Sequence, residues 1–564
     1  MILHNMYSSL IVALFCSWSP IVALSPQDHF KEGGSDNQQA LYDRVLSQIG
    51  ENLDFVENDE QMIILKEDRL DHVTSLMGKN FRTLEAIQGS ISQIGDEVIG
   101  SGPNDLFGIS AALSYNGKYF VVGAPGNGKG YTKVYMRSNT FPPQWTQVGS
   151  TIFGKANKDR SGNEVAISRD GTIIAIGATH NDANTLNSGQ VRIFELNATQ
   201  EWEQLGDVIQ GEEKKDHFGP AIALSDDGKC IAIGTDNYDS AGEKDFGHVR
   251  VFKWNESEWV QEGKDIVGEA AEDASGYSVA MSGDGTIVVI GANQNDPDHN
   301  NNNAGHVRVY KRNADTNALG WTQVGGDLDG EFAADESGIS VATSQDGNTV
   351  VIGAIKNDDT SSNAGHVRVY VRNETNTDEP VGWTMLGGDI DGESKGDKSG
   401  ITVSTTSDGR TVVIGARNND GNGNNAGHAR IFQYDGVEKE WVKVGRDIDG
   451  EEAGDNAGFD SHISGDGKTV IVGARYNDSN GKDSGHVRIF HLGSLTAVVP
   501  FGESGGGKYL VLESVYRCNQ TLESLSSPFN PTLPVFHASF VQLYQIRISR
   551  PIIITTLASM ESVI

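Results

Sequence analysis

Cysteine is almost missing from this 564-residue chain, which contains only Cys16, Cys230 and Cys518. Three cysteines cannot form a disulfide framework, so a large packed core must stabilise the fold. Basic residues are also scarce, because 44 Lys and Arg are outnumbered by 77 Asp and Glu and the net charge is −33. Nucleic acids are bound by clustered Lys and Arg, so this charge argues against such a partner. Cations, basic proteins and plain solvation remain as interpretations.

The chain also lacks a hydrophobic run long enough to cross a membrane, which takes about 20 apolar residues. The apolar stretch at residues 10–24 is broken by Ser19 and Pro20 and is followed by polar sequence. We interpret residues 1–24 as a signal peptide, with an uncleaved anchor as the alternative. The sequence therefore predicts a secreted or cell-surface protein without a transmembrane span.

Glycine, in contrast, is abundant at 68 residues, and it marks an internal repeat. Four short strand patterns separated by turn signals recur seven times along the chain. Such units indicate a β-propeller, because a single blade cannot bury its own faces. We predict an all-β fold, a seven-bladed β-propeller of four-stranded antiparallel blades, over residues 90–492. The repeats open at Gly108, Gly162, Gly219, Gly276, Gly338, Gly400 and Gly458.

The repeat region begins with a lone fourth strand and ends with a unit that lacks its fourth strand. Residues 91–100 align with residues 321–330, the fourth strand of a unit, whereas the seventh unit ends after Phe490 without its own fourth strand. We therefore expect the N-terminal strand to complete the last blade and close the ring. A closed ring leaves no unpaired inner edge.

Two flanking segments differ from the repeats in composition. Residues 25–89 are acidic and carry a heptad-like apolar spacing from Ile63 to Ile87, which predicts a short α-helical N-terminal segment. This helix would serve as a stalk through which the protein oligomerises, dock on the propeller, or form a linker. Residues 493–564 lose the repeat, and we leave this tail unassigned, with disorder as one interpretation.

In six units the turn between the first two strands has the pattern S-x-D-G, which is typical of β-hairpins. In the sixth unit, residues 407–409 read as a version shortened by one residue. The second strands, such as residues 286–292, are continuous β-branched runs, and this predicts burial on both faces.

Every unit also carries an aspartate three residues before its opening glycine. Such regular repetition indicates a structural role, in which the carboxylate accepts hydrogen bonds from the backbone or from the blade's own histidine. Catalysis would require one blade that differs from the rest. No blade stands out in the sequence, so we predict that the protein is not an enzyme. The aspartates are Asp105, Asp159, Asp216, Asp273, Asp335, Asp397 and Asp455, and the histidines are His248, His306, His366, His428 and His486.

Strand alternation predicts which loops share a face. The loops after the second and fourth strands open on one side, which we call the acidic face, and the other loops open on the opposite side. Sequons in the third-to-fourth-strand loops predict glycosylation of that opposite side, at Asn197, Asn255 and Asn373; Asn477 and Asn519 are further sequons. The acidic face is therefore the predicted binding face. Its D-x-D-G-E segments contribute Asp327, Asp329, Glu331, Asp389, Asp391, Glu393, Asp447, Asp449 and Glu451.

Loops after the second strands place oxygen-bearing side chains at alternate positions, as the first half of a calcium-binding loop does. The pattern predicts Ca²⁺ as the one cofactor, although a solvated turn of Asn, Asp and Gly is the alternative. No loop supplies the glycine and bidentate glutamate that complete an EF-hand. The predicted ligands are Asp296, Asp298, Asn300, Asp420, Asn422, Asn424, Asp478 and Asn480.

These units resemble FG-GAP repeats, the blades of integrin-alpha-like propellers. Phe107-Gly108 and Phe218-Gly219 match the Phe-Gly pair, and Val122 to Pro125 matches the Gly-Ala-Pro element. Most units have Ser-Gly or Ala-Gly instead, and the short S-x-D-G turn replaces the family's calcium loop. The resemblance implies an extracellular recognition or adhesion module.

Together these observations predict an extracellular binding scaffold that recognises a protein or a glycan through its acidic face. Two alternatives remain open. A glycan hydrolase or lyase would use the central channel, and a structural wall or matrix protein would use the N-terminal stalk.

Overall fold

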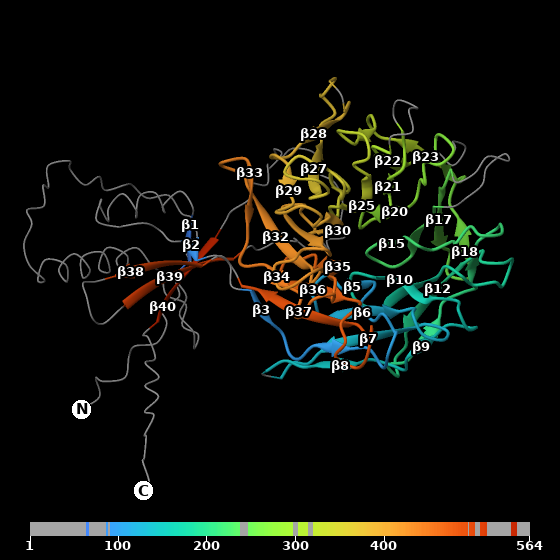
Figure 1. The fold of residues 1–564 in the computed structure, drawn as a ribbon, viewed down its shortest axis with the longest axis horizontal. Helices are drawn as coiled ribbons and strands as arrows, with labels where there is room; N and C mark the ends of the chain where they lie inside the picture. The colour runs from blue at the N-terminus through green and yellow to red at the C-terminus, as the bar shows by residue number, and fades with distance from the viewer. Residues whose placement is uncertain are drawn as a thin grey trace, which may run out of the picture. The chain divides into compact units, whose positions relative to one another are not determined.

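The computed structural model describes residues 91–493 except for residue 141, residues 237–245, 297–302 and 314–319, and residue 379. It also assigns a few strands outside this range. The chain divides into two compact units, Ile91–Leu492 and a second one formed by Met1–Ser90 with Gly493–Ile564. The first unit contains seven sheets around a common axis (Figure 1). It is a seven-bladed β-propeller with antiparallel blades, as predicted from the repeats.

The first strand of each blade lines the central axis, and the labels of these seven strands encircle the centre of the propeller in Figure 1. The chain then zigzags outward in each blade. The first strands are β5 (Ala111–Leu113), β10 (Ser161–Ile167), β15 (Ile222–Leu224), β20 (Ser278–Met281), β25 (Ser337–Thr343), β30 (Ser399–Thr405) and β35 (Ala457–Ile463). The second strands are β6 (Tyr119–Ala124), β11 (Ile173–Ala178), β16 (Cys230–Thr235), β21 (Ile287–Ala292), β26 (Thr349–Ala354), β31 (Thr411–Ala416) and β36 (Thr469–Ala474).

The third strands begin on the acidic face. They are β7 (Tyr131–Arg137), β12 (Gln190–Leu196), β17 (His248–Trp254), β22 (His306–Arg312), β27 (His366–Arg372), β32 (His428–Asp435) and β37 (His486–Leu492). Each fourth strand consists of two short pieces that both pair with the third strand. In blades 1 to 6 these are β8 (Trp145–Gln147) and β9 (Ile152–Phe153), β13 (Trp202–Gln204) and β14 (Ile209–Gln210), β18 (Trp259–Gln261) and β19 (Ile266–Val267), β23 (Trp321–Gln323) and β24 (Leu328–Asp329), β28 (Trp383–Met385) and β29 (Ile390–Asp391), and β33 (Glu440–Lys443) and β34 (Ile448–Asp449).

The N-terminal strand closes the ring, as the sequence predicts. β3 (Ile91–Gln93) and β4 (Val98–Ile99) are the two pieces of the fourth strand of blade 7, and both pair with β37. Trp145 of blade 1 donates a 2.9 Å hydrogen bond from Nε1 to the carbonyl of Ile94, which follows β3. Blade 7 is thus built from chain segments about 400 residues apart (Ile91↔Leu492), and its N-terminal piece contacts blade 1.

The second strands are buried on both faces, as their β-branched composition predicts. All six residues of β11, β16, β21, β26 and β36 are buried. The glycine near the end of each second strand lets the next blade approach. A Cβ on Gly353, for example, would lie 2.1 Å from the carbonyl oxygen of Gly400. This contact explains why both glycines recur in the repeat.

The S-x-D-G turns are hairpins in which the hydroxyl caps the turn. Ser344 donates to Asp346 Oδ1 at 2.6 Å and accepts from the backbone of Thr349. The sixth turn is not shortened, which corrects the sequence interpretation. Thr406 stands where the other blades have serine, and its hydroxyl donates to Asp408 Oδ1 at 2.6 Å.

The second residues of these turns form a belt at one end of the channel. Each turn donates a backbone hydrogen bond to the turn of the next blade, and the bond from Asp466 to Tyr115 completes the circle. Because the belt passes through every blade, it couples all of them around the axis. Its bonds run from Tyr115 to Arg169, Asp226, Gly283, Gln345 and Ser407, and then to Gly465.

Neighbouring blades are also joined by repeated side-chain contacts. The third-strand arginine of one blade reaches the fourth strand of the blade before it, so that Arg430 Nη2 donates to the Asp391 carbonyl at 2.7 Å. The fourth-strand tryptophan does the same at the other end of the blade, and Trp441 Nε1 donates to the Leu386 carbonyl at 2.7 Å. Six of the seven blades supply this arginine and six supply this tryptophan; blade 1 has Lys133 at the arginine position, and blade 7 has Ile91 at the tryptophan position.

The second unit contains its own five-stranded sheet in the order β1-β40-β39-β38-β2. Its strands are β1 (Ile64–Lys66), β2 (Ala86–Ile87), β38 (Thr496–Phe501), β39 (Lys508–Val515) and β40 (Leu543–Ser549). The predicted signal peptide at 1–24 lies outside the described residues, as do most of the helical segment at 25–89 and of the tail at 493–564. Among the described residues there is no helix, and hence none that could cross a membrane.

Candidate functional site

The repeated aspartates are structural anchors, but their partner is not the histidine. All seven are buried, with 2–3% of their surface exposed. Asp397 Oδ2 accepts hydrogen bonds from the backbone of Ser394 at 3.0 Å and from Asn419 Nδ2 at 2.9 Å. Asn419 lies in the loop after the second strand of the same blade, and Asn181, Asn357 and Asn477 make the equivalent bond in other blades. Of the two donors expected from the sequence, the backbone is confirmed, and an asparagine takes the place of the blade's own histidine.

The histidines instead gather carboxylates on the acidic face. In four places among the described residues, one His and two or three Asp or Glu side chains bring their ligand atoms within 4.8 Å of one another. Each histidine opens a third strand, and its carboxylates come from the fourth-strand segments of its own and the preceding blade, joined in blade 5 by Asp359 from the loop after β26. The clusters are Glu269, His306 and Asp327; Glu331, Asp359, His366 and Asp389; Glu393, His428 and Asp447; and Glu97, Glu451 and His486.

The predicted binding-face residues thus divide into two groups. Asp327, Glu331, Asp389, Glu393, Asp447 and Glu451 belong to the clusters. The backbone carbonyls of Asp329, Asp391 and Asp449 receive the arginines of the next blade. Sequence reasoning missed Glu97, Glu269 and Asp359 as members. Glu97 could have been found, because residues 91–100 align with residues 321–330 and Glu97 falls opposite Asp327.

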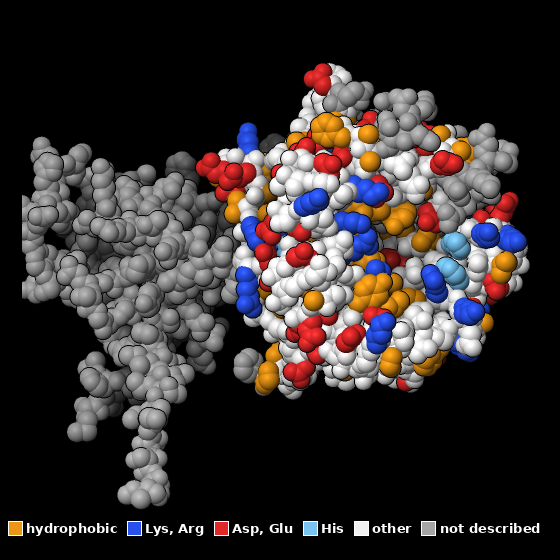
Figure 2. Space-filling model, in the orientation of Figure 1, with side chains coloured by type: hydrophobic (Ala, Val, Ile, Leu, Met, Phe, Trp, Pro, Cys, Tyr) orange, Lys and Arg blue, Asp and Glu red, His pale blue; other side chains and the backbone are white. Residues whose placement is uncertain are grey.

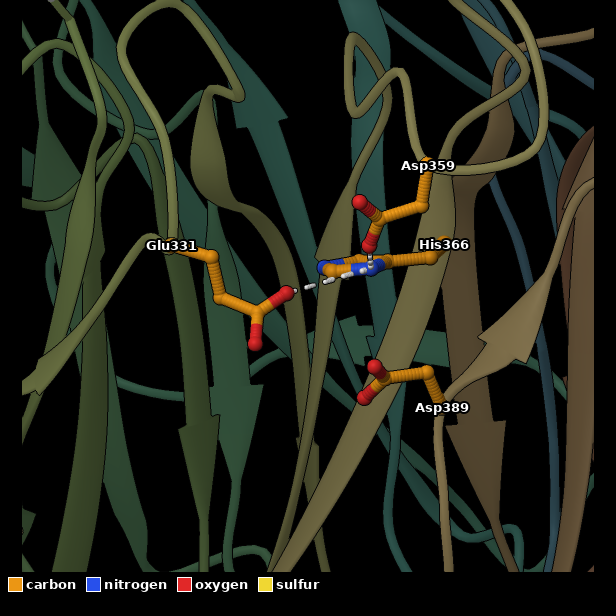
Figure 3. A group of neighbouring side chains, drawn as sticks. All are labelled: Glu331, Asp359, His366 and Asp389. Carbon is orange, nitrogen blue, oxygen red and sulfur yellow. Dashed lines mark ion pairs between the residues drawn. The ribbon is translucent and has the colours of Figure 1, made fainter.

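Blade 5 has the largest cluster, drawn in Figure 3. The His366 ring lies among three carboxylates, with its Nδ1 3.9 Å from Glu331 Oε2 and 3.8 Å from Asp359 Oδ2. Asp389 approaches from the side opposite Asp359 (Figure 3). The histidine is fully buried, whereas the Glu331 and Asp359 side chains are about one-third exposed. The cluster is therefore open to solvent on the carboxylate side only.

Burial determines the protonation of this cluster. It lowers the pKa of His366 to about 3, with the nearby Arg368 charge contributing, so the imidazole is neutral at neutral pH. Burial also raises the pKa of Glu331 and of Asp389, and Arg368 partly offsets both shifts. At neutral pH the contacts in Figure 3 therefore join a neutral imidazole to carboxylates and are not ion pairs with an imidazolium.

The residues predicted to bind calcium lie in the loops after the second strands, and their side chains hold these loops. Asp420 Oδ1 and Asp478 Oδ1 each accept a backbone hydrogen bond at 2.7 Å from within the loop, and Asp296 Oδ1 accepts one from Asn303. Asn422 and Asn480 direct their amide donors at backbone carbonyls. Asn424 Oδ1 accepts from Asn425. Asp298 and Asn300 lie outside the described residues.

The three predicted glycosylation sites lie in the loops between third and fourth strands. Asn255 is exposed, whereas Asn197 and Asn373 are partly buried. Another sequon, at Asn477, is unsuitable for a glycan because this side chain is buried and bonded to Asp455. Asn519 lies outside the described residues.

Three residues that line the central channel differ from their equivalents in the other blades, and sequence reasoning did not identify them. It encloses about 480 Å³ and is lined by the seven first strands. Glu164 and Asp460 occupy a position where the other blades have Ser, Thr or Ala, and His462 occupies one where they have Ala or Ser. Asp460 accepts hydrogen bonds from the Ala111 backbone and from Thr402 Oγ1. An alignment of the seven first strands would have revealed these three unrepeated residues.

The pKa values of these three channel residues are shifted. Burial raises the pKa of Asp460 to about 6 and lowers that of His462 to about 4. Burial and the charge of Asp460 also raise the pKa of Glu164.

Figure 2 shows hydrophobic, Lys and Arg side chains around the centre of the ring, with acidic side chains over the surrounding blades. Glu164 and Asp460 come from blades 2 and 7, on either side of blade 1.

Comparison with known proteins supports the repeat assignment. The model of the FG-GAP repeat family matches residues 267–310, which extend from β19 into β22. No curated protein matches the sequence. Among solved structures, the periplasmic gluconolactonase of Pseudomonas aeruginosa is 15% identical with a TM-score of 0.42, covering 69% of this chain and 89% of its own. Hydrazine synthase of Kuenenia stuttgartiensis is 12% identical with a TM-score of 0.43, covering 67% and 94%. The chain is a seven-bladed β-propeller that carries an FG-GAP repeat.

Proposed function

We propose that the protein is a non-enzymatic binding scaffold, secreted or at the cell surface, that recognises a protein or glycan through its acidic face. One observation carries this proposal. The aspartates, arginines and tryptophans of the framework are used in hydrogen bonds within and between blades, whereas the cluster carboxylates remain partly exposed on one face. A rigid ring that presents variable loops on one side is suited to recognition.

The proposal is tested with arrays of immobilised glycans and extracellular proteins. The test variant neutralises four acidic-face carboxylates in the full chain, by Glu331→Gln, Asp389→Asn, Glu393→Gln and Asp447→Asn. The control neutralises the same number on the opposite side, by Glu256→Gln, Glu374→Gln, Glu438→Gln and Asp378→Asn. Ligands bound by wild type and control but lost in the test variant support the proposal. Equal binding by both variants contradicts it.

Calcium is a separate part of this proposal. If the loops containing Asp420 and Asp478 bind Ca²⁺, the ion stabilises the native state by mass action. The melting temperature of the full chain should then rise by several degrees with Ca²⁺ and fall again with EDTA. A melting temperature that does not respond to either addition excludes calcium from these loops.

The channel residues support a second candidate, a glycan hydrolase or lyase. Two carboxyl groups with raised pKa values beside an unrepeated histidine are the groups that general acid–base catalysis uses. The test is the release of reducing or unsaturated ends from a polysaccharide panel. Activity in wild type that disappears in Glu164→Gln would establish the enzyme, and its absence across the panel favours the scaffold.

A further inference from the structure

The cluster in blade 5 differs from the other three in having a fourth member. Asp359 follows Asn357-Asp358 in the loop after β26. At the same position the other blades with an Asn-Asp loop have Ala183, Pro297, Gly421 and Ser479. Among the blades with an Asn-Asp loop, a carboxylate at this position is therefore found in blade 5 alone. It is not needed for the propeller framework, because the other blades form without it.

His366 gives independent evidence that something is missing from this cluster. Its side chain is 0% exposed, yet neither ring nitrogen has a hydrogen-bond partner among the described residues. A buried imidazole without a partner is costly, and each such group in a native structure requires an explanation. Its Nδ1 points at the carboxylates, which offer acceptors at 3.8 and 3.9 Å, too far for hydrogen bonds (Figure 3).

We infer that blade 5 binds a first-row divalent transition-metal ion, of the type of Zn²⁺, through His366 Nδ1 and the carboxylates of Glu331, Asp359 and Asp389. One imidazole with carboxylates suits zinc and similar ions, whereas Ca²⁺ prefers oxygen ligands alone. The four ligand atoms already lie within 4.8 Å of one another. In a tetrahedral site with bonds near 2.1 Å they would be about 3.4 Å apart, so the partly exposed carboxylates need to move only about 1 Å.

The surroundings match a divalent cation in charge and orientation. Three carboxylates and the Arg368 guanidinium leave two negative charges at the site. Arg368 Nη1 lies 3.6 Å from Glu331 Oε1, and its Nη2 donates to the Asp329 carbonyl at 2.6 Å. The arginine thereby holds one carboxylate oxygen and leaves Oε2 facing His366. Outer-shell groups of this kind orient the ligands of metal sites.

The site is tested by zinc titration calorimetry on the full chain, after EDTA treatment and at physiological ionic strength. Wild type should bind one Zn²⁺ ion tightly. His366→Gln should weaken this binding by about 100-fold or more, because it removes a ligand, and Asp359→Ser by about 10-fold. Gln190 occupies the histidine position in blade 2, and Ser479 the Asp359 position in blade 7, so both replacements occur naturally in this fold.

The matched control is His428→Gln, the same change in blade 6, where Gly421 replaces the fourth ligand. It should leave the tight site intact. Co²⁺ supplies a second readout, because wild type and His428→Gln should develop visible absorption that His366→Gln lacks. Melting curves verify that every variant folds. Equal zinc affinity in wild type and His366→Gln, or displacement of zinc by equimolar Ca²⁺, would overturn the inference.

Discussion

At the scale of single residues, Asp460 is held by hydrogen bonds while its burial disfavours its charged form. It accepts hydrogen bonds from the Ala111 backbone and Thr402, yet burial raises its pKa to about 6. Because the folded-state pKa exceeds the unfolded value of 3.8, the native state favours the protonated form. The associated stability is complete below pH 4 and is lost as the pH rises through 6.

Asp460→Asn should therefore stabilise the protein at pH 7.5, by at most about 3 kcal/mol, because the amide carries no charge. Thr402 can still pair with the new side chain by accepting a hydrogen bond. The measurement is the free energy of urea unfolding at pH 4 and pH 7.5. The two proteins should differ at pH 7.5 and converge at pH 4. A variant that is less stable at both pH values would show that the lost hydrogen bond dominates.

The residue before each structural aspartate gives a second prediction at this scale. Glu272 has a φ of 72°, in the left-handed region, and the equivalent positions in blades 6 and 7 are occupied by Gly396 and Gly454. Left-handed geometry destabilises a non-glycine residue by about 1–2 kcal/mol. Glycine removes this strain, but it loses more conformational entropy on folding, which offsets part of the gain. Glu272→Gly should raise the free energy of unfolding by up to about 1 kcal/mol. Glu272→Ala, which keeps the strain, should give no such gain.

At the scale of elements, ring closure depends on β3 and β4. Without them, β37 loses its outer partner and Trp145 its acceptor at Ile94. A chain starting at residue 101 should melt at a lower temperature and associate through the exposed edge. The matched control starts at residue 90, which removes β1 and β2 equally but keeps the closing strand.

A synthetic peptide of residues 90–100 extends this prediction. Added to the chain that starts at residue 101, it should pair with β37 and restore the melting temperature, as strand addition does at other sheet edges. Size-exclusion chromatography should show the associated species dissociating. Identical melting of the two truncated chains would mean that the belt of turn hydrogen bonds closes the ring without β3.

The same elements show what the sequence can predict. Strand runs, turns and glycine spacing specify blades because they are local, and the alignment of residues 91–100 with residues 321–330 specifies ring closure. The partner of Asp397 was not predictable, because Asn419 and the histidine are both near it in sequence. Glu164 and Asp460 were missed for another reason. Their departure from the Ser, Thr or Ala of the other blades is visible when the first strands are aligned, but their proximity is not, because blades 2 and 7 are far apart in the chain and lie on either side of blade 1.

At the scale of the whole molecule, two effects of acid oppose each other. The net charge of −33 at pH 7 falls in magnitude as carboxylates protonate, which relieves repulsion in the folded state. Five buried third-strand histidines act in the other direction. Burial lowers the pKa of His306 and His366 to about 3 and that of His248, His428 and His486 to about 4.

These histidines should dominate between pH 7 and pH 5. Their folded-state pKa values lie below the unfolded value of 6.5, so their stability contribution is complete above pH 6.5 and is lost as the pH falls toward the folded values. At pH 5 the loss is about 2 kcal/mol for each histidine. We expect the five together to outweigh the opposing gain from the carboxyls whose pKa burial raises, among them Asp460, Glu164 and Glu331. We expect the free energy of unfolding, measured with EDTA present, to fall over this range. His428→Gln, with the residue that blade 2 carries at Gln190, should reduce the fall by about 2 kcal/mol. Stability that instead rises toward pH 5 would mean that relief of charge repulsion controls the acid response.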